Sequence, residues 1–366
     1  HLSIRRQRQM CIRDRSKAIN FALIGCGAIA KKHIAALKRI DGAELVGVYD
    51  IDAERSDALA KDHGLVSFAD VDTMVEKARP DVFVILTPSG DHAVRLMDLT
   101  KYNKHFVVEK PLALRLCDVE SILRECDERG LKVFVVKQNR FNPPIQELKR
   151  AIDEGRFGKL VMGTVRVRWC RNQEYYDQKK WRGTWCYDGG VLTNQASHHI
   201  DMLVWMMGEV ESVVARTSTR LVDIEAEDTG VAILKFRNGA LGIVEATTAA
   251  RPKDLEGSIS VLGQEGAVEV GGFFMNELKT WNFTSEDPRD SHVWENLAKV
   301  PGEMAWNHTA YYRDVIESLR SGRRGLVDGL EGKKSVELIN AIYESAETGR
   351  EVQLRFTPKR CRLGEK

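Results

Sequence analysis

The sequence predicts an α/β protein of two domains, a doubly wound parallel sheet followed by an α+β domain with a large, mainly antiparallel open sheet. Short β-rich runs alternate with amphipathic helical stretches from residue 18 to about residue 140. Long strands of alternating polarity, separated by tight turns, follow Pro143 and Pro144. A length of 366 residues suits two domains of ordinary size.

The first domain is predicted over residues 18–140. Its β-rich runs cover residues 19–24, 44–49, 82–86, 105–108 and 132–136. The helical patterns between them cover residues 28–40, 53–63, 91–100 and 118–129. Apolar strands separated by helices of this length indicate right-handed βαβ units and a parallel sheet buried on both faces, as in the Rossmann fold.

The second domain is predicted over residues 141–356. Its alternating runs cover residues 160–169, 213–220, 231–236, 240–247 and 257–262. Asn238-Gly239 predicts a two-residue hairpin turn, and residues 264–266 predict another turn. One helix is expected over 193–207, and two closing helices over 308–320 and from about 328 to Gly349. Such a sheet has one covered face and one that is open or paired with a partner.

Composition excludes several classes of protein. Apolar residues make up 43% and charged residues 30%, which is typical of a globular chain and not of a disordered or fibrous one. The apolar runs are too short to cross a membrane. Seven cysteines without a C-x-x-C pair predict neither a disulfide framework nor a metal site, and a reducing cytoplasm is expected.

Positive charge is concentrated at the two ends of the chain. Residues 1–17 form a basic leader, predicted to be non-native or disordered, and residues 357–366 form a basic tail. The net charge is only +2, so the body between them is mildly acidic. Nucleic-acid binding, which needs a basic stripe on a folded face, is therefore not expected.

A glycine motif, Gly25-x-Gly27-x-x-Ala30, directly follows the first predicted strand and opens the first helix. Gly25 permits the tight turn, Gly27 lets the backbone approach a pyrophosphate, and the small Ala30 allows close packing. The helix N-terminus adds a positive dipole. We therefore expect this turn, including Ala28 and Ile29, to bind a dinucleotide.

An acidic residue, Asp50, ends the second predicted strand 23 residues after Gly27. A carboxylate at this place accepts hydrogen bonds from the ribose hydroxyls and repels a 2′-phosphate, so NAD is favoured over NADP. Ile51 is expected to contact the cofactor beside it. The alternative is that Asp50 caps the helix that begins at Ala53.

The turns after the next strands are expected to line the cofactor crevice, because ligands of open α/β sheets bind beyond the carboxyl ends of the strands. The residues concerned are Thr87, Pro88, His92, Glu109, Lys110 and Gln138. Lys110 can hold a substrate hydroxyl and accept its proton if burial lowers its pKa. The alternative is a surface lysine paired with a neighbouring acid.

A second candidate for proton transfer is His198. It lies four residues after Asn194, and this spacing puts both side chains on one face of the helix predicted over 193–207. Histidine is a natural proton acceptor near neutral pH. His199 would point about 100° away and be packed or solvated. The alternative is that the pair is an ordinary polar helix face.

Aromatic and arginine side chains cluster between residues 171 and 185, among them Tyr175, Trp181 and Arg182. Such a loop suits a ligand with a flat ring and anionic groups, for example a nucleotide sugar. The alternative is that Trp181 and Trp185 pack the following helix against the sheet.

The glycine motif, Glu109-Lys110-Pro111, and Gly189-Gly190 followed by His198-x-x-Asp201 together resemble the Gfo/Idh/MocA oxidoreductases over about residues 18–356. The resemblance implies an NAD-dependent dehydrogenase that acts on a CH–OH group. It also implies Lys110 and His198 as the catalytic pair, and a homo-oligomer, dimer or tetramer, formed through the open sheet.

One departure narrows the choice within this family. Many members carry an aspartate where this chain has Asn194. The stretches 137–140, 173–177, 181–185 and 194–198 resemble the WlbA-type UDP-N-acetyl-2-amino-2-deoxyglucuronate (UDP-GlcNAcA) dehydrogenases, which oxidise the sugar C3 hydroxyl for bacterial surface polysaccharide. This resemblance implies that Asn194 and Gln195 hold the sugar, and that Arg140 or Arg182 holds the carboxylate or diphosphate.

Two other functions stay open from the sequence. The first is a dehydrogenase of a free sugar or cyclitol, against which Asn194 and the aromatic loop count. The second is a non-catalytic sensor of NAD or a nucleotide sugar, which would not need both Lys110 and His198.

Overall fold

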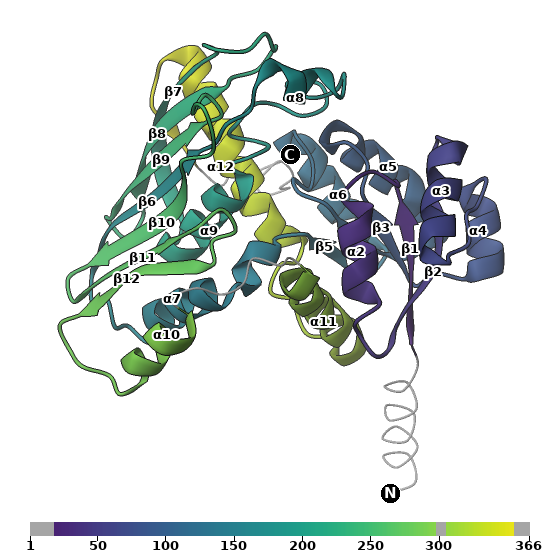
Figure 1. Cartoon of the computed structure of the whole chain (residues 1–366), viewed down its shortest axis with the longest axis horizontal. Helices are drawn as coiled ribbons and strands as arrows, with labels where there is room; N and C mark the ends of the chain where they lie inside the picture. Colours follow the sequence, from purple (N-terminus) through teal and green to yellow (C-terminus); the bar gives the residue numbers. More distant parts are fainter. Residues whose placement is uncertain (1–17, 298–304, 355–366) are drawn as a thin grey trace, which may run out of the picture.

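A computed structural model describes residues 18–297 and 305–354, so the basic leader and the basic tail lie outside the described residues. The chain forms a five-stranded and an eight-stranded sheet. Figure 1 shows them on opposite sides of the molecule, with helix α12 (Gly329–Thr348) passing between them. Within the described ranges, no helix is both long and apolar enough to cross a bilayer.

The five-stranded sheet has the order β2-β1-β3-β4-β5, and every pair is parallel. Its strands are β1 (Ile19–Ile24), β2 (Ala43–Tyr49), β3 (Val82–Ile85), β4 (His105–Val108) and β5 (Val133–Val135). The helices of this domain are α2 (Ala30–Leu37), α3 (Ala53–His63), α4 (Val71–Ala78), α5 (His92–Leu99) and α6 (Leu116–Glu128). The predicted doubly wound sheet is confirmed, and its strand order reverses between β1 and β3, where a ligand crevice is expected.

The eight-stranded sheet has the order β12-β11-β10-β6-β9-β8-β7-β13, and every pair except β6–β9 is antiparallel. Its strands are β6 (Leu160–Arg168), β7 (Val210–Ser218), β8 (Thr229–Phe236), β9 (Leu241–Thr247), β10 (Glu256–Gly263), β11 (Gly266–Gly271), β12 (Glu277–Phe283) and β13 (Val352–Gln353). The predicted, mainly antiparallel sheet is confirmed.

The hairpin between β8 and β9 differs in detail from its prediction. The amide of Phe236 donates to the carbonyl of Ala240, so the loop holds three residues, 237–239, and not two. Gly239 takes the left-handed conformation at φ +86°, which lets the longer loop close.

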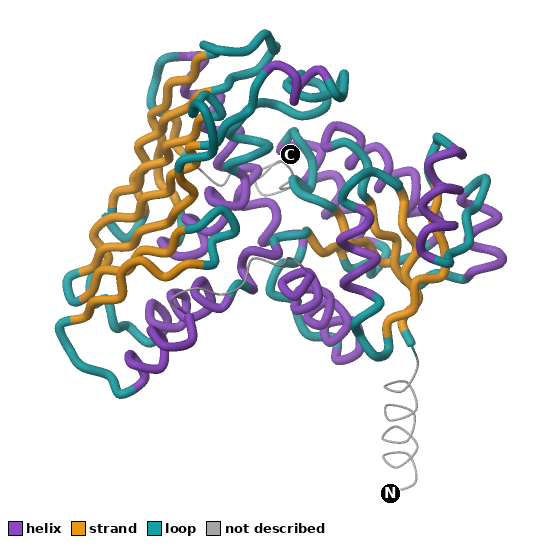
Figure 2. Tube along the Cα trace, in the orientation of Figure 1, coloured by secondary structure: helices purple, strands orange, loops and turns teal. Residues whose placement is uncertain are grey.

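Among the described residues, helices cover one face of the large sheet. Helices α9 (Ser197–Met207) and α12 pack on the face turned toward the first domain, and a Cβ at Gly163 on β6 would lie 2.6 Å from Met207. Helices α7 (Pro143–Asp153) and α10 (Arg289–Leu297) lie near the edge formed by β11 and β12. In Figure 2 the strands form one outer layer of the molecule, and no helix of the described residues covers its outer face.

Helix α11 (Ala305–Ser321) follows strand β12 of the large sheet in the sequence but packs against α2 of the first domain. Its Tyr311, Tyr312 and Val315 are buried in the same core as Phe21 of β1. The rings of Phe21 and Tyr312 meet edge to face at 5.5 Å. The first domain therefore takes part of its core from residues that follow seven strands of the second sheet.

Candidate active site

The turn after β1 is open toward a ligand on one side and tightly packed on the other. Gly25 has φ +102°, and a Cβ there would lie 2.9 Å from the carbonyl carbon of Leu86. A Cβ at Gly27 would meet no atom within 4 Å. Helix α2 begins at Ala30 with no side-chain cap and no acid in its first turn, so the positive end of its dipole can receive an anion. This turn fits a dinucleotide pyrophosphate, with Ala28 and Ile29 at its rim.

Asp50 braces this turn. One carboxylate oxygen accepts from the amide of Cys26 at 2.7 Å, and the other accepts from the amide of Asp52 at 3.0 Å. Helix α3 is capped by Asp52 and not by Asp50. Ile51 is 83% exposed beside it. Contacts of Asp50 and Ile51 with the cofactor stay predictions.

The turns after β3 and β4 are joined by His92. Its Nδ1 lies 2.7 Å from the carbonyl oxygen of Pro111, and its Nε2 lies 2.9 Å from that of Thr87. Burial lowers the pKa of His92, although both carbonyls act against this shift. His92 therefore links the two turns that are expected to line the crevice. The Thr87 hydroxyl beside Pro88 is buried with no hydrogen-bond partner in the described structure, so it is available to a ligand.

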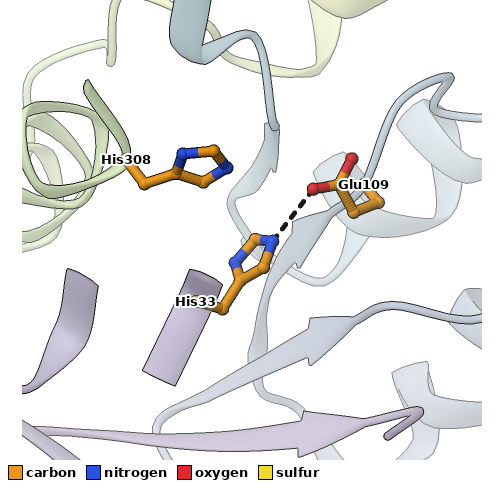
Figure 3. A group of neighbouring side chains, drawn as sticks. All are labelled: His33, Glu109 and His308. Atoms are coloured by element: carbon orange, nitrogen blue, oxygen red, sulfur yellow. Dashed lines mark hydrogen bonds and ion pairs between the residues drawn. The ribbon is translucent and has the colours of Figure 1, made fainter. Parts of the chain in front are cut away.

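Glu109 points toward α2 and α11 (Figure 3). It accepts from His33 Nε2 at 2.9 Å and from the backbone amide of Lys110 at 3.0 Å. Burial alone would raise its pKa, but the hydrogen bond and charge of His33 lower it to about 2. Tyr312 bonds His33 Nδ1 at 2.6 Å, so both nitrogens of this ring are engaged.

His308 faces the same pair in Figure 3, and the ligand atoms of His33, Glu109 and His308 lie within 4.8 Å of one another. The residue types could hold a metal. Because hydrogen bonds already use both nitrogens of His33, we interpret the group as a brace that holds the Lys110 turn.

Lys110 reaches across from the first domain to the second. Its Nζ donates to the backbone oxygen of Asn194 at 2.7 Å and lies 3.3 Å from Asn194 Oδ1. The Asn194 amide donates in turn to Asp188 at 2.6 Å. Burial lowers the pKa of Lys110, while Glu109 and Asp188 act in the opposite direction.

Helix α9 begins at Ser197 and not at residue 193, which corrects the predicted helix. The amides of Val191 and Leu192 donate to the backbone and side-chain oxygens of Glu227. The amide of Ala196 donates to the carbonyl of Val191, five residues back and not four, so the chain before Ser197 is an irregular turn. Asn194 therefore lies in a turn and does not share a helix face with His198.

His198 lies in the first turn of α9. Its Nε2 is 3.4 Å from the Gln138 amide nitrogen, and its buried Nδ1 has no hydrogen-bond partner in the described structure. Burial, then the charges of Lys110 and Lys137, hold the pKa of His198 well below its usual value. The ring is thus neutral at neutral pH and can accept a proton. His199 is packed edge to face against Trp169.

Arg140 does not point into an open site, contrary to its predicted role in binding a substrate anion. Its side chain is 1% exposed and makes two hydrogen bonds to Asp201, at 2.8 and 2.9 Å. A third goes to Glu331 at 3.0 Å. All three nitrogens of this guanidinium therefore already donate to protein carboxylates.

Lys137 belongs to the stretch 137–140 that carries the resemblance, but the sequence predicts no role for it. It follows the carboxyl end of β5, as Lys110 follows β4, and this shared position could have identified it. Its Nζ donates to Ser335 at 2.8 Å and lies 3.7 Å from Asp201. Burial lowers its pKa to about 8, against the attraction of Asp201.

The aromatic loop, which includes helix α8 (Gln173–Asp177), rests on the first domain. The amide of Gly90 donates to the carbonyl of Tyr187 at 2.9 Å, and a Cβ at Gly90 would clash with the carbonyl oxygen of Cys186. The Arg182 guanidinium stacks on the Tyr175 ring at 4.0 Å, next to Trp181. The amide oxygen of the buried Gln195 has no hydrogen-bond partner within the described ranges.

Two family models match the chain. The NAD-binding Rossmann fold of the Gfo/Idh/MocA oxidoreductase family matches residues 19–137, and the C-terminal alpha/beta domain of the same family matches residues 149–354.

Solved structures and sequence relatives give different substrates. The chain is 42% identical to the WlbA dehydrogenase from Bordetella pertussis in complex with NADH and UDP-GlcNAcA, over 93% of this chain and 99% of that one, with a TM-score of 0.89. The corresponding complex from Chromobacterium violaceum is also 42% identical, over 93% and 97%, with a TM-score of 0.87. A myo-inositol 2-dehydrogenase from Thermotoga maritima is 26% identical, over 92% of this chain and 98% of that protein.

Proposed function

The chain belongs to the Gfo/Idh/MocA oxidoreductases and is an NAD-dependent dehydrogenase acting on CH–OH groups, and on this premise we propose that it oxidises the C3 hydroxyl of UDP-GlcNAcA. The observation that carries the proposal is the pair of contacts between the Lys110 amine and Asn194, close to a neutral His198. The higher identity to the two WlbA dehydrogenases, 42% against 26% for the inositol enzyme, favours the nucleotide sugar.

In the proposed reaction, Lys110 is the nearest hydrogen-bonding partner of the C3 hydroxyl, and His198 is the co-acid/base. Bound NAD supplies the hydride acceptor. Burial lowers the pKa of Lys110 and holds the pKa of His198 well below its usual value, and both shifts favour the uncharged forms that can accept the hydroxyl proton. Asn194 fixes the Lys110 amine, and Gln195 offers an unpaired amide oxygen to the sugar.

Arg182 is the proposed partner of the substrate carboxylate or diphosphate, because Arg140 is already occupied by Asp201 and Glu331. The Arg182 Nε is buried without a hydrogen-bond partner in the described part of the chain. Stacking on Tyr175 and hydrogen bonds from Nη1 to the Tyr175 carbonyl and the Gln178 side chain hold the guanidinium, so Nε and Nη2 are the donors proposed for an anion.

We also propose that two copies associate through the outer face of the large sheet. Alternate side chains on this face are apolar and 40–61% exposed: Val214, Val231, Ile233, Leu241 and Leu262. Leaving such a patch in water is unfavourable, and a second copy would bury it.

NADH formation tests the proposed reaction with UDP-GlcNAcA, UDP-N-acetylglucosamine and myo-inositol side by side. Turnover of the uronate alone would support it, and turnover of myo-inositol alone would overturn it. Lys110→Met and His198→Asn should each lower kcat by about 100-fold or more and leave the Kd of NADH unchanged. NADH binding without turnover of any of the three would favour a sensor.

A further inference from the structure

A buried carboxylate is linked to the reactive lysine through one amide. Asp188 is 2% exposed and receives two hydrogen bonds, from the backbone amide of Gly183 at 2.9 Å and from Asn194 Nδ2 at 2.6 Å. The other end of the Asn194 amide, Oδ1, lies 3.3 Å from Lys110 Nζ.

The carboxylate decides which end of the Asn194 amide faces the lysine. An anion accepts only from the NH₂ end, so the carbonyl end must turn toward Lys110. Without the anion, nothing in this chain of contacts would stop the amide from presenting its NH₂ group to the amine. Two donors would then face each other, and Lys110 would lose a partner.

We propose that Asp188 is a positioning residue for Lys110, which through Asn194 fixes the direction of the amine and raises its affinity for a proton. This inference rests on the proposed function, in which Lys110 binds the reacting hydroxyl. It assigns a role to a residue that touches neither substrate nor cofactor.

Other charges surround the two ends of this chain of contacts. Glu109, Lys137 and His198 influence the site around Lys110, and Arg182 and Glu227 lie near Asp188. Asp188→Asn removes the charge of Asp188 and changes none of the other charged residues named here. Removing a negative charge near an amine disfavours the ammonium form, so the pKa of Lys110 should fall.

The pH range of the test follows from Asp188 itself. Burial raises the pKa of Asp188 to about 6, so its charge is fully present only above this pH. The measurements therefore cover pH 6.5 to 10, roughly the range between a half-charged Asp188 and an unperturbed lysine.

The test compares the wild type, Asp188→Asn and the exchange variant Asp188→Asn/Asn194→Asp, which moves the carboxylate next to the amine. Glu225→Gln is the matched control, because Glu225 accepts from the Trp185 amide in the same loop but has no bond to Asn194 or Lys110. A small acylating reagent that reacts with unprotonated amines modifies Lys110, and peptide mass spectrometry measures the rate. The pH dependence of this rate gives the apparent pKa of the amine. The pH profile of kcat/KM is measured in parallel.

In Asp188→Asn the apparent pKa of Lys110 should fall by about one unit, and the limb of the profile that Lys110 controls should shift with it. The control should leave both unchanged, and the exchange variant should raise the pKa above the wild-type value, because its carboxylate contacts the amine directly. An unaltered pKa in Asp188→Asn would overturn the proposal even if kcat fell. If Asp188→Asn does not fold, the exchange variant decides: a Lys110 pKa above the wild-type value supports the proposal, and an unaltered pKa overturns it. The amine titration needs no substrate, so failure of the proposed reaction would be seen separately.

Discussion

Substitution of Gly27 by alanine should separate cofactor binding from stability. A Cβ at this position meets no protein atom within 4 Å, so the folded chain accepts it without strain. The loss of glycine freedom in the unfolded chain should make the variant as stable as the wild type or stabler by about 0.5 kcal/mol. The same methyl group would occupy the space in which the backbone approaches the pyrophosphate, so the Kd of NADH should rise about 10-fold or more, a loss of about 1.4 kcal/mol.

Gly25→Ala is the matched comparison. Gly25 has φ +102°, and its Cβ would lie 2.9 Å from the Leu86 carbonyl carbon. This variant should lose at least about 2 kcal/mol of stability through backbone strain and clash. Fluorescence titration with NADH and urea unfolding measure the two quantities. If Gly27→Ala bound NADH as tightly as the wild type, this turn would not be the pyrophosphate site.

Three further predictions concern burial and assembly. Asp201→Asn should lower the free energy of unfolding in urea by about 3 kcal/mol, because Arg140 and Lys137 would lose a buried counter-charge. A decrease below about 1 kcal/mol would contradict this reasoning. Burial raises the pKa of Glu227 from 4.5 to about 7, so the folded state disfavours its charge and the wild type loses stability as pH rises through this range. Glu227→Gln should therefore be stabler than the wild type by about 1–3 kcal/mol at pH 8, a gap that closes near pH 4.5; a gap independent of pH would refute this. Ile233→Asp should shift sedimentation velocity toward the monomer, and an unchanged profile would exclude the outer face as the interface.

Local patterns explain why much of the first domain could be predicted. The strand, Gly25, Gly27 and helix α2 are consecutive in the chain, and each depends on its own neighbours. The same holds for the hairpin at Asn238, whose presence is confirmed although its loop is one residue longer than expected.

Long-range hydrogen bonds explain what could not be predicted. Glu227 binds the amides of Val191 and Leu192 from more than thirty residues away, and no periodicity records this contact. The partners of Arg140 likewise come from α9 and α12, so its sequence position could not reveal that its charge was already used. Asp188 belongs to no motif and becomes significant only through its bond to Asn194.

The return of α11 to the first domain has a consequence for the synthesis of the protein. The ribosome delivers the chain in order, and domains usually fold as their residues emerge. Here Tyr311, Tyr312 and Val315 emerge after seven of the eight strands of the large sheet, so until then the apolar surface of β1 and α2 that they cover stays exposed. Synthesis of the nucleotide-binding domain thus begins first, but the nascent chain must carry the incomplete core of this domain until α11 has been made.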